Sequence, residues 1–212
     1  MKIIPAKPAF GQTLQPGYCG FITREHDIVG DGIEWFERFE TGIPFVHTFV
    51  VDGTDAATPQ ASNPPTIPII EAHAGPGVHR ATLDEYLGQK DCQCFIRIPV
   101  GWTPAIGAEI VAAAATHLGE RYGFTLIVAD ALANTFFGHC LNNLSLGLTD
   151  RFVCRALSNA HRKICSQLVA LALQSQPCLR LRGCLRRPAD TIMPRDLGND
   201  PEIWDPCIYR IG

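Results

Sequence analysis

The chain lacks three features that would place it in common functional classes. It has no surplus of positive charge, because 18 lysines and arginines against 21 aspartates and glutamates give a net charge of −3. Non-specific nucleic-acid binding needs such a surplus, so we expect no nucleic-acid partner. No apolar run approaches the roughly 18 residues that span a bilayer, so we expect no integral membrane association. Walker and G-x-G-x-x-G motifs are also missing, which leaves nucleotide binding without support.

An export signal and a regular cysteine framework are lacking as well. The start of the chain, MKIIPAKPAFGQ, has no apolar core of signal-peptide length, so we expect a cytoplasmic protein. The nine cysteines are odd in number and irregular in spacing, which makes a disulfide scaffold the weaker interpretation. Cys92 and Cys94 form a C-x-C pair, but no second close pair completes a tetrahedral zinc site. We therefore expect neither a metal nor a cofactor, and most cysteines should be small buried side chains.

The composition is that of a single folded domain spanning residues 1–212. Hydrophobic residues make up 46% of the chain and charged residues 18%, and no linker or internal repeat divides it. Strands are predicted where β-branched and aromatic residues cluster between turn signals. These stretches are Gly20 to Arg24, Phe45 to Val51, Ile67 to Glu71 and Phe95 to Val100. Because turns separate consecutive strands, the sequence predicts a small antiparallel sheet.

Two helices are predicted after these strands. Thr103 is the expected N-cap of the first, with Pro104 at its first position, and apolar residues then recur every four residues until Gly119. The second, Ile164 to Gln174, is apolar on nearly every face and should be buried. Strands followed by helices predict an α+β fold in which a small antiparallel sheet packs against helices.

Other segments have weaker patterns. Residues 27–40 fit a short or irregular amphipathic helix, and residues 58–68 fit a long hairpin loop. Residues 124–160 are expected to be an insertion of short helices and loops. The C-terminal part, residues 178–212, is interpreted as a tail containing arginine and proline. Its four clustered arginines are expected to lie on a solvated surface rather than to bind an anion; they are Arg180, Arg182, Arg186 and Arg187.

Three residues are candidates for chemistry, and each has a plain structural alternative. Cys165 begins the buried helix, where backbone N–H groups and the helix dipole favour a thiolate, but it could equally be a packed core cysteine. His47 lies in an apolar strand, either as a satisfied core residue or as a general base for Cys165. Glu71, at the end of the next strand, either reaches solvent or orients His47 by accepting its second ring N–H.

Four segments in order resemble the circularly permuted papain-like cysteine hydrolases, the YiiX-like relatives of the NlpC-type peptidases. The segments are H-T-F-V-V-D-G from His47, I-I-E-A-H-A-G-P-G-V-H-R around Glu71, G-E-R-Y-G-F around Tyr122 and I-C-S-Q-L-V-A-L-A-L around Cys165. In that family a histidine opens the sheet, an acidic residue follows on the next strand, and a late helix carries the nucleophile. The resemblance covers roughly residues 17–200 and implies a permuted papain-like (NlpC-type) catalytic domain.

This resemblance implies a role for each residue. Cys165 would be the nucleophile, His47 the base and Glu71 the residue that orients the base. Tyr122 would contribute to substrate binding or to the oxyanion site, although Gly123 stands where the family has Asp. The implied activity is thiol hydrolysis of an amide (peptide or isopeptide) or ester bond through an acyl-enzyme, without metal or cofactor. The substrate would be a peptide, an amide or an acyl ester, and the oligomeric state is not readable from the sequence.

Three alternatives remain open at this stage. The fold could be catalytically inactive and act in binding or assembly, with Cys165 as a core residue. A lipid acyltransferase or esterase would use the same fold and the same residues. A zinc-binding structural protein is the third possibility, since His73 and His79 with His26 or His139 could be drawn as a metal site. The last receives low weight because no helical i, i+4 pair or cysteine partner supports it.

Overall fold

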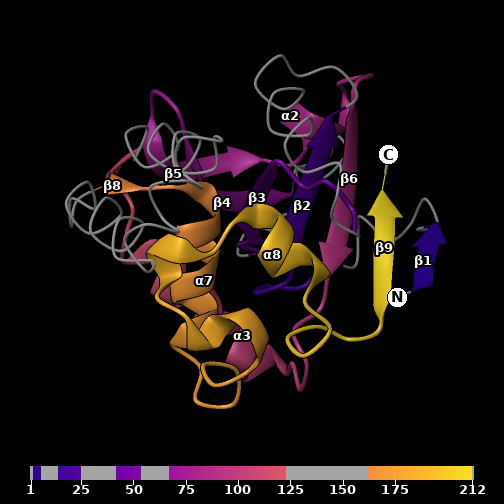
Figure 1. Cartoon of the computed structure of the whole chain (residues 1–212). Coiled ribbons are helices and arrows are strands. Elements are labelled where there is room, and N and C mark those ends of the chain that lie inside the picture. Colours follow the sequence, from indigo (N-terminus) through magenta and orange to yellow (C-terminus); the bar gives the residue numbers. More distant parts are fainter. Residues whose placement is uncertain (1, 6–13, 25–41, 54–66, 123–161, 212) are drawn as a thin grey trace, which may run out of the picture.

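The structure, a computed structural model, describes residues 2–5, 14–24, 42–53, 67–122 and 162–211 (Figure 1). It is an α+β fold, as predicted, built on a seven-stranded sheet in the order β1-β9-β6-β2-β3-β4-β5. The six strands from β9 to β5 are antiparallel to their neighbours, and β1 adds to β9 in parallel. The strands are β1 (Lys2–Pro5), β2 (Cys19–Arg24), β3 (His47–Val51), β4 (Pro68–His73), β5 (Gly77–Thr82), β6 (Cys92–Arg97) and β9 (Cys207–Ile211). A separate two-stranded parallel pair joins β7 (Arg121–Tyr122) and β8 (Arg162–Lys163).

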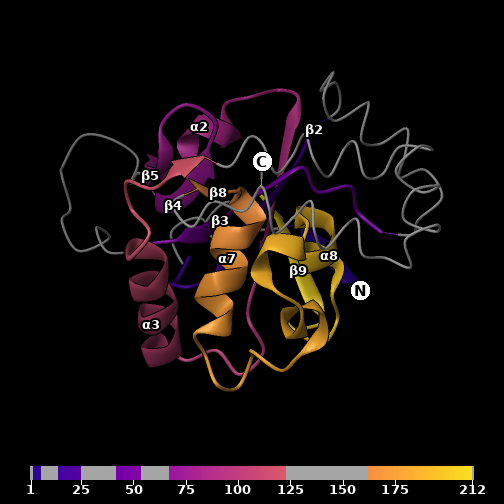
Figure 2. The same cartoon turned by 60° about the vertical axis from the view of Figure 1, so that its left-hand side comes forward.

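Helices cover one face of the sheet more heavily than the other. The helices are α2 (Asp84–Leu87), α3 (Pro104–Ala115), α7 (Cys165–Gln174) and α8 (Pro194–Asn199), with 3-10 turns η2 (Gly183–Arg186) and η3 (Ala189–Thr191). Figure 2 shows α7 between α3 and α8, in front of the sheet. The short α2 contributes Tyr86 to the core on the opposite face. No helix within these described ranges is long and apolar enough to cross a membrane.

The sheet separates two hydrophobic cores because alternate strand residues point to opposite faces. On the helix-covered face, Ile70 and Ala72 of β4 pack with Leu168 and Leu173 of α7. On the other face, Ile69 of the same strand packs with residues that include Ile22, Phe49, Val51, Leu83 and Tyr86. Glu71 shares this second face with Ile69, so a carboxylate is placed beside an apolar cluster.

The predicted helices are present, with small shifts at their ends. The Thr103 side chain accepts the Ile106 backbone N–H at 3.3 Å, and Pro104 occupies the first turn, which confirms the expected N-cap. Helix α3 ends at Ala115, one turn before Gly119, which lies at φ +86°. Helix α7 begins at Cys165 and is buried along most of its length, as its apolar composition predicts.

The predicted strands are also present, although their boundaries differ. The fourth was expected at residues 95–100 and is found at Cys92–Arg97. Pro99 lacks the N–H that a central strand needs, and it makes only an isolated bridge to Trp204. The expected strand from Phe45 begins instead at His47, and the one expected to end at Glu71 continues to His73.

Five strands were not predicted from the sequence: β1, β5 and β9 of the large sheet, and the two-residue strands β7 and β8. The hairpin between β4 and β5 turns through Gly75 and Gly77, both with positive φ. A Cβ on Gly77 would lie 2.1 Å from the Glu120 carbonyl oxygen, so this turn requires glycine. Strand β9 lies in the segment interpreted as a tail, where it pairs with both β1 and β6. Both ends of the chain therefore lie at the same edge of the sheet (Figure 1).

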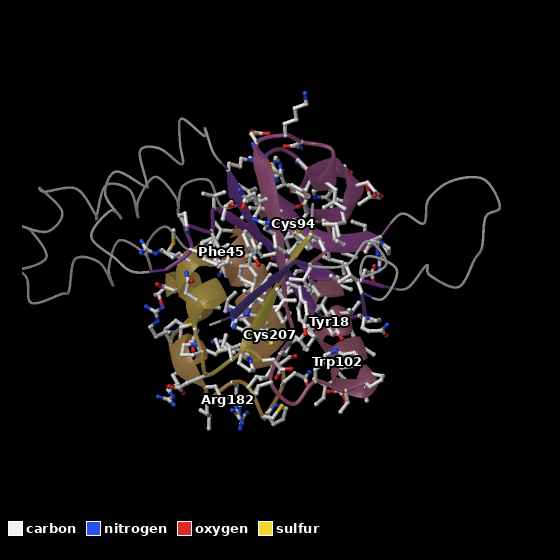
Figure 3. All side chains as sticks on the ribbon, turned by 90° about the vertical axis from the view of Figure 1, so that its right-hand side faces the viewer. Tyr18, Phe45, Cys94, Trp102, Arg182 and Cys207 are labelled. Atoms are coloured by element: carbon white, nitrogen blue, oxygen red, sulfur yellow. The ribbon has the colours of Figure 1, made fainter. Side chains whose placement is uncertain are left out.

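The C-terminal segment is tied to the sheet by a buried cation. Arg97 of β6 donates hydrogen bonds to the carbonyl oxygens of Gly198 and Asp205 and lies against the Trp204 ring. The segment is therefore part of the folded domain. Its four clustered arginines are exposed, as predicted, and Arg182 marks the outer edge of the molecule (Figure 3). Ion pairs join Arg186 to Glu202 at 2.9 Å and Arg187 to Asp196 at 2.6 Å.

Several predictions fall on parts of the chain that the structure does not describe. The expected helix over 27–40 and the expected insertion over 124–160 lie outside the described residues. The expected hairpin loop over 58–68 does so too, apart from its last two residues, and Pro68 begins β4.

Candidate functional site

The site starts with a histidine and a carboxylate on adjacent strands. His47 is the first residue of β3, and Glu71 lies in β4 directly opposite Phe49. Since His47 and Phe49 are two residues apart, they share a face of the sheet with Glu71. His47 Nε2 lies 2.7 Å from Glu71 Oε2, and the two side chains are 13% and 3% exposed. The neighbouring strands thus hold an imidazole against a buried carboxylate.

Cys165 reaches this pair from the start of α7. Ile164 precedes it in an extended conformation, so Cys165 is the first helical residue and lies at the positive end of the helix dipole. Helix α7 packs against β3 and β4, as Figure 2 shows. Cys165 is 5% exposed and lies close enough to the His47 ring to raise the pKa of His47 through its charge and hydrogen bonding. Because His47 Nε2 contacts Glu71, Nδ1 is the ring nitrogen left for the sulfur.

The protonation of His47 follows from these two partners. Burial on its own lowers the pKa of an imidazole, because it disfavours the charged form. Here the charge and hydrogen bond of Cys165, together with those of Glu71, outweigh burial and raise the pKa of His47 to about 9. His47 therefore carries a proton at neutral pH. Its two partners, Cys165 and Glu71, are both negative when ionised, and they favour the protonated imidazole.

Glu71 has two partners that the sequence did not suggest. The Tyr86 hydroxyl of α2 donates to Oε2 at 2.5 Å, the same oxygen that faces His47. His79 Nε2 of β5 lies 3.5 Å from the other oxygen, Oε1. Burial alone would raise the pKa of Glu71, but His47, Tyr86 and His79 together lower it. The carboxylate is therefore ionised and held on both oxygens.

Tyr122 lies beside the same group. Its strand β7 pairs with β8 in parallel, so that Tyr122 is opposite Lys163, two residues before Cys165. The pKa of Tyr122 is raised, first by burial and then by the negative charges of Cys165 and Glu71. The phenol is therefore neutral and can donate a hydrogen bond. The structure thus brings together all four residues singled out from the sequence.

A metal-binding arrangement is not found in the described part of the chain. No group of three or more histidine, cysteine, aspartate or glutamate side chains there could hold a metal ion. His73 is exposed, and its ring lies edge-on to His47 with the centroids 6.0 Å apart. The other two histidines considered, His26 and His139, lie outside the described residues.

Three other cysteines have environments that suppress ionisation. Burial raises the pKa values of Cys19 and Cys94 far above the ordinary range, and Cys94 is further affected by Cys92. For Cys184, burial and the nearby Asp200 raise the pKa to about 12. Unlike these thiols, Cys165 has an imidazole as its partner.

His79 could have been found from the sequence, whereas Tyr86 could not. In the β4–β5 hairpin, His79 is directly opposite Glu71, so recognising the Gly75-Pro76-Gly77 turn would have predicted this cross-strand pair. Tyr86 follows the hairpin in a four-residue helix with no strong periodicity. Its contact with Glu71 depends on how α2 folds back over the sheet, which no local pattern indicates.

Comparison with models of known protein families gives no match, and comparison with curated protein sequences gives none either.

Proposed function

We propose that this protein is a thiol hydrolase of the circularly permuted papain-like class, which cleaves an amide (peptide or isopeptide) or an ester bond. The observation that carries the proposal is that His47 interacts with Glu71 on one side and with Cys165 on the other. A nucleophile, a base and a group that orients the base are the elements of a catalytic triad. The chain order His, Glu, Cys and the α+β fold support the permuted papain-like assignment.

In the first step, the Cys165 sulfur attacks the carbonyl carbon of the substrate. The new S–C bond converts the carbonyl into a tetrahedral intermediate, whose oxygen carries the negative charge. The proton held by His47 then passes to the leaving nitrogen or oxygen as its bond to carbon breaks. An acyl-thioester on Cys165 and a free amine or alcohol result.

In the second step, water releases the acyl group. His47, now neutral, accepts a proton from water as the oxygen attacks the thioester carbon. The C–S bond breaks, and the products are the carboxylic acid and the restored Cys165–His47 pair. Glu71 stabilises the imidazolium in both steps because its Oε2 accepts the Nε2–H hydrogen bond.

The intermediate oxyanion needs hydrogen-bond donors. The Cys165 backbone N–H is one candidate, since N–H groups in the first turn of a helix have no intrahelical partner. The Tyr122 hydroxyl is the second candidate, because burial and the neighbouring negative charges keep it protonated. In this proposal Tyr122 binds the developing charge or the substrate next to it.

The proposal can be tested without knowing the natural substrate. The full chain is mixed with p-nitrophenyl acetate, whose acetyl group any reactive thiolate accepts. We expect a burst of p-nitrophenolate followed by slower turnover, with acetyl found on Cys165 by peptide mass spectrometry. Cys165→Ala should abolish both phases, whereas Cys178→Ala, which removes an exposed thiol, should leave them unchanged. Acetyl spread over the exposed cysteines without turnover would favour the non-catalytic binding protein.

A further inference from the structure

Tyr86 contacts both partners of the hydrogen bond that orients the histidine. Its hydroxyl donates to Glu71 Oε2 at 2.5 Å, and its ring stacks on the His47 imidazole with centroids 5.6 Å apart and planes at 27°. The same ring also stacks on Phe49 with centroids 5.9 Å apart and planes at 14°. Tyr86 is 6% exposed, so it is held in place by its surroundings.

The hydroxyl selects one orientation of the carboxylate. Glu71 Oε2 accepts from both Tyr86 and His47, while Oε1 faces His79 at 3.5 Å. Without the Tyr86 hydroxyl, a buried carboxylate oxygen would lose a charge-assisted donor, and His79 would compete with His47 for Glu71. The ring acts separately, because stacking fixes the plane in which the imidazole presents its two nitrogens.

We propose that Tyr86 is a positioning residue, which holds the Glu71 carboxylate on His47 Nε2 and thereby directs the opposite ring nitrogen toward Cys165. Its role in catalysis rests on the proposed function, because a positioning residue acts only through the triad that it orients. Its effect on His47 does not depend on turnover and can be measured separately.

The test uses Tyr86→Phe in the full chain, since phenylalanine keeps the stacked ring and removes only the hydroxyl. Tyr18→Phe is the matched control, because it also removes one tyrosine hydroxyl. The ring of Tyr18 packs edge-on against Trp102 (Figure 3), with ring centroids 5.1 Å apart, instead of stacking on the His47 imidazole. His47 is titrated by NMR with histidine labelled with ¹⁵N, and its signals are assigned with His47→Gln. Ester hydrolysis is measured in parallel as kcat and KM.

We expect Tyr86→Phe to lower the midpoint of the His47 titration by about one pH unit, because Glu71 spends less time on Nε2. We expect kcat to fall roughly tenfold with KM unchanged, which is typical of a lost hydrogen bond to a charged group. Tyr18→Phe should change neither quantity. His79→Gln added to Tyr86→Phe should restore part of both, because the competing imidazole is removed.

An unchanged His47 midpoint in folded Tyr86→Phe would overturn the inference. A raised midpoint would overturn it as well, because it would show that Tyr86 only withdraws charge from Glu71. If the wild-type chain has no esterase activity, the proposed function fails, yet the NMR titration still decides whether Tyr86 positions Glu71. The two ideas therefore fail through different measurements.

Discussion

His47 and Glu71, which are 24 residues apart in the sequence, are joined by a 2.7 Å contact between Nε2 and Oε2 on neighbouring strands. The contact fixes which ring nitrogen faces away from the carboxylate. Cys165, in the first turn of a buried helix, lies close enough to the imidazole to raise the pKa of His47. Strand pairing and helix packing thus bring the nucleophile, the base and the carboxylate together, and the chemistry proposed above depends on this contact.

Substitutions within this group should have graded effects on hydrolysis. Cys165→Ala should abolish the acyl-enzyme, and His47→Ala should reduce kcat by about 10²- to 10⁴-fold, the usual contribution of a general acid–base. Glu71→Gln should cost less, because the amide oxygen can still accept the Nε2–H hydrogen bond. Steady-state kinetics on one ester substrate would measure all three. If Glu71→Gln abolished activity while His47→Ala retained it, the roles of base and orienting residue would be wrongly assigned.

Stability should depend on pH through His47. Its pKa in the folded protein is about 9, above its ordinary value of 6.5. The protonated form is therefore favoured by folding, and its contribution is fully present below about pH 6.5 and lost as the pH rises through 9. The contribution is at most about 3–4 kcal/mol, since each pH unit corresponds to roughly 1.4 kcal/mol.

Urea denaturation at pH values from 6 to 10 would measure this contribution. Other groups also titrate above pH 8, so the informative quantity is the difference between the wild-type chain and His47→Gln. This difference in free energy of unfolding should shrink as the pH rises through 9. A difference that stays constant or grows over this range would show that His47 is not protonated in the folded protein.

The sequence predicted the central strands and both long helices because each carries a local signal. Thr103-Pro104 begins α3, and an uninterrupted apolar run marks α7 as buried. Strand β9 was missed because its partners, β1 and β6, lie about 205 and 115 residues earlier in the chain. Pairing over such separations depends on the whole sheet rather than on the five residues Cys207–Ile211.

The candidate site was predictable where motif and strand order coincided. His47, Glu71 and Cys165 were found as a resemblance of segments, and the structure places them close together. Tyr86 was not found, because a tyrosine in a four-residue helix has no local feature that distinguishes it from any other tyrosine. Tertiary packing places the groups that support a catalytic residue, and local sequence patterns do not predict tertiary packing.

A glycine beneath the site should be irreplaceable. Gly20 of β2 is directly opposite Phe49, and a Cβ there would come within 1.9 Å of the Phe49 ring. Phe49 stacks on Tyr86, so displacing its ring would disturb the contacts of Tyr86 with His47 and Glu71. Gly20→Ala should destabilise the fold by about 1–3 kcal/mol, as overpacking in a core does, and it should also lower activity.

Gly88→Ala is the control for this substitution. Gly88 has φ −80°, and the nearest atom to an added Cβ is a backbone oxygen 3.6 Å away. Alanine there should change the free energy of unfolding by less than about 0.5 kcal/mol. Thermal or urea unfolding of Gly20→Ala and Gly88→Ala would measure the loss of stability in each variant. Equal stability of the two would show that Phe49 can move away from Gly20 at little cost.

Thiol reactivity tests the site independently of any substrate. Only thiolates react with iodoacetamide at a useful rate, and an unperturbed cysteine, with a pKa near 8.5, is well under 1% ionised at about pH 6. Interaction with an imidazolium at a helix N-terminus stabilises a thiolate at such a pH. Cys165 should therefore be the first cysteine alkylated, although it is only 5% exposed, because the reagent is small.

The role of Cys165 is decided by comparing its rate of alkylation with that of a thiol that is exposed to solvent. Cys178 is exposed, so accessibility alone predicts that it is labelled before Cys165. In His47→Ala the imidazolium is removed, and the preference for Cys165 should fall sharply. Mass spectrometry of the labelled peptides, with a denatured sample as the reference for full labelling, gives the order directly. If Cys178 were labelled first and Cys165 stayed inert in the folded wild-type chain, Cys165 would be a core residue and the non-catalytic interpretation would be the better one.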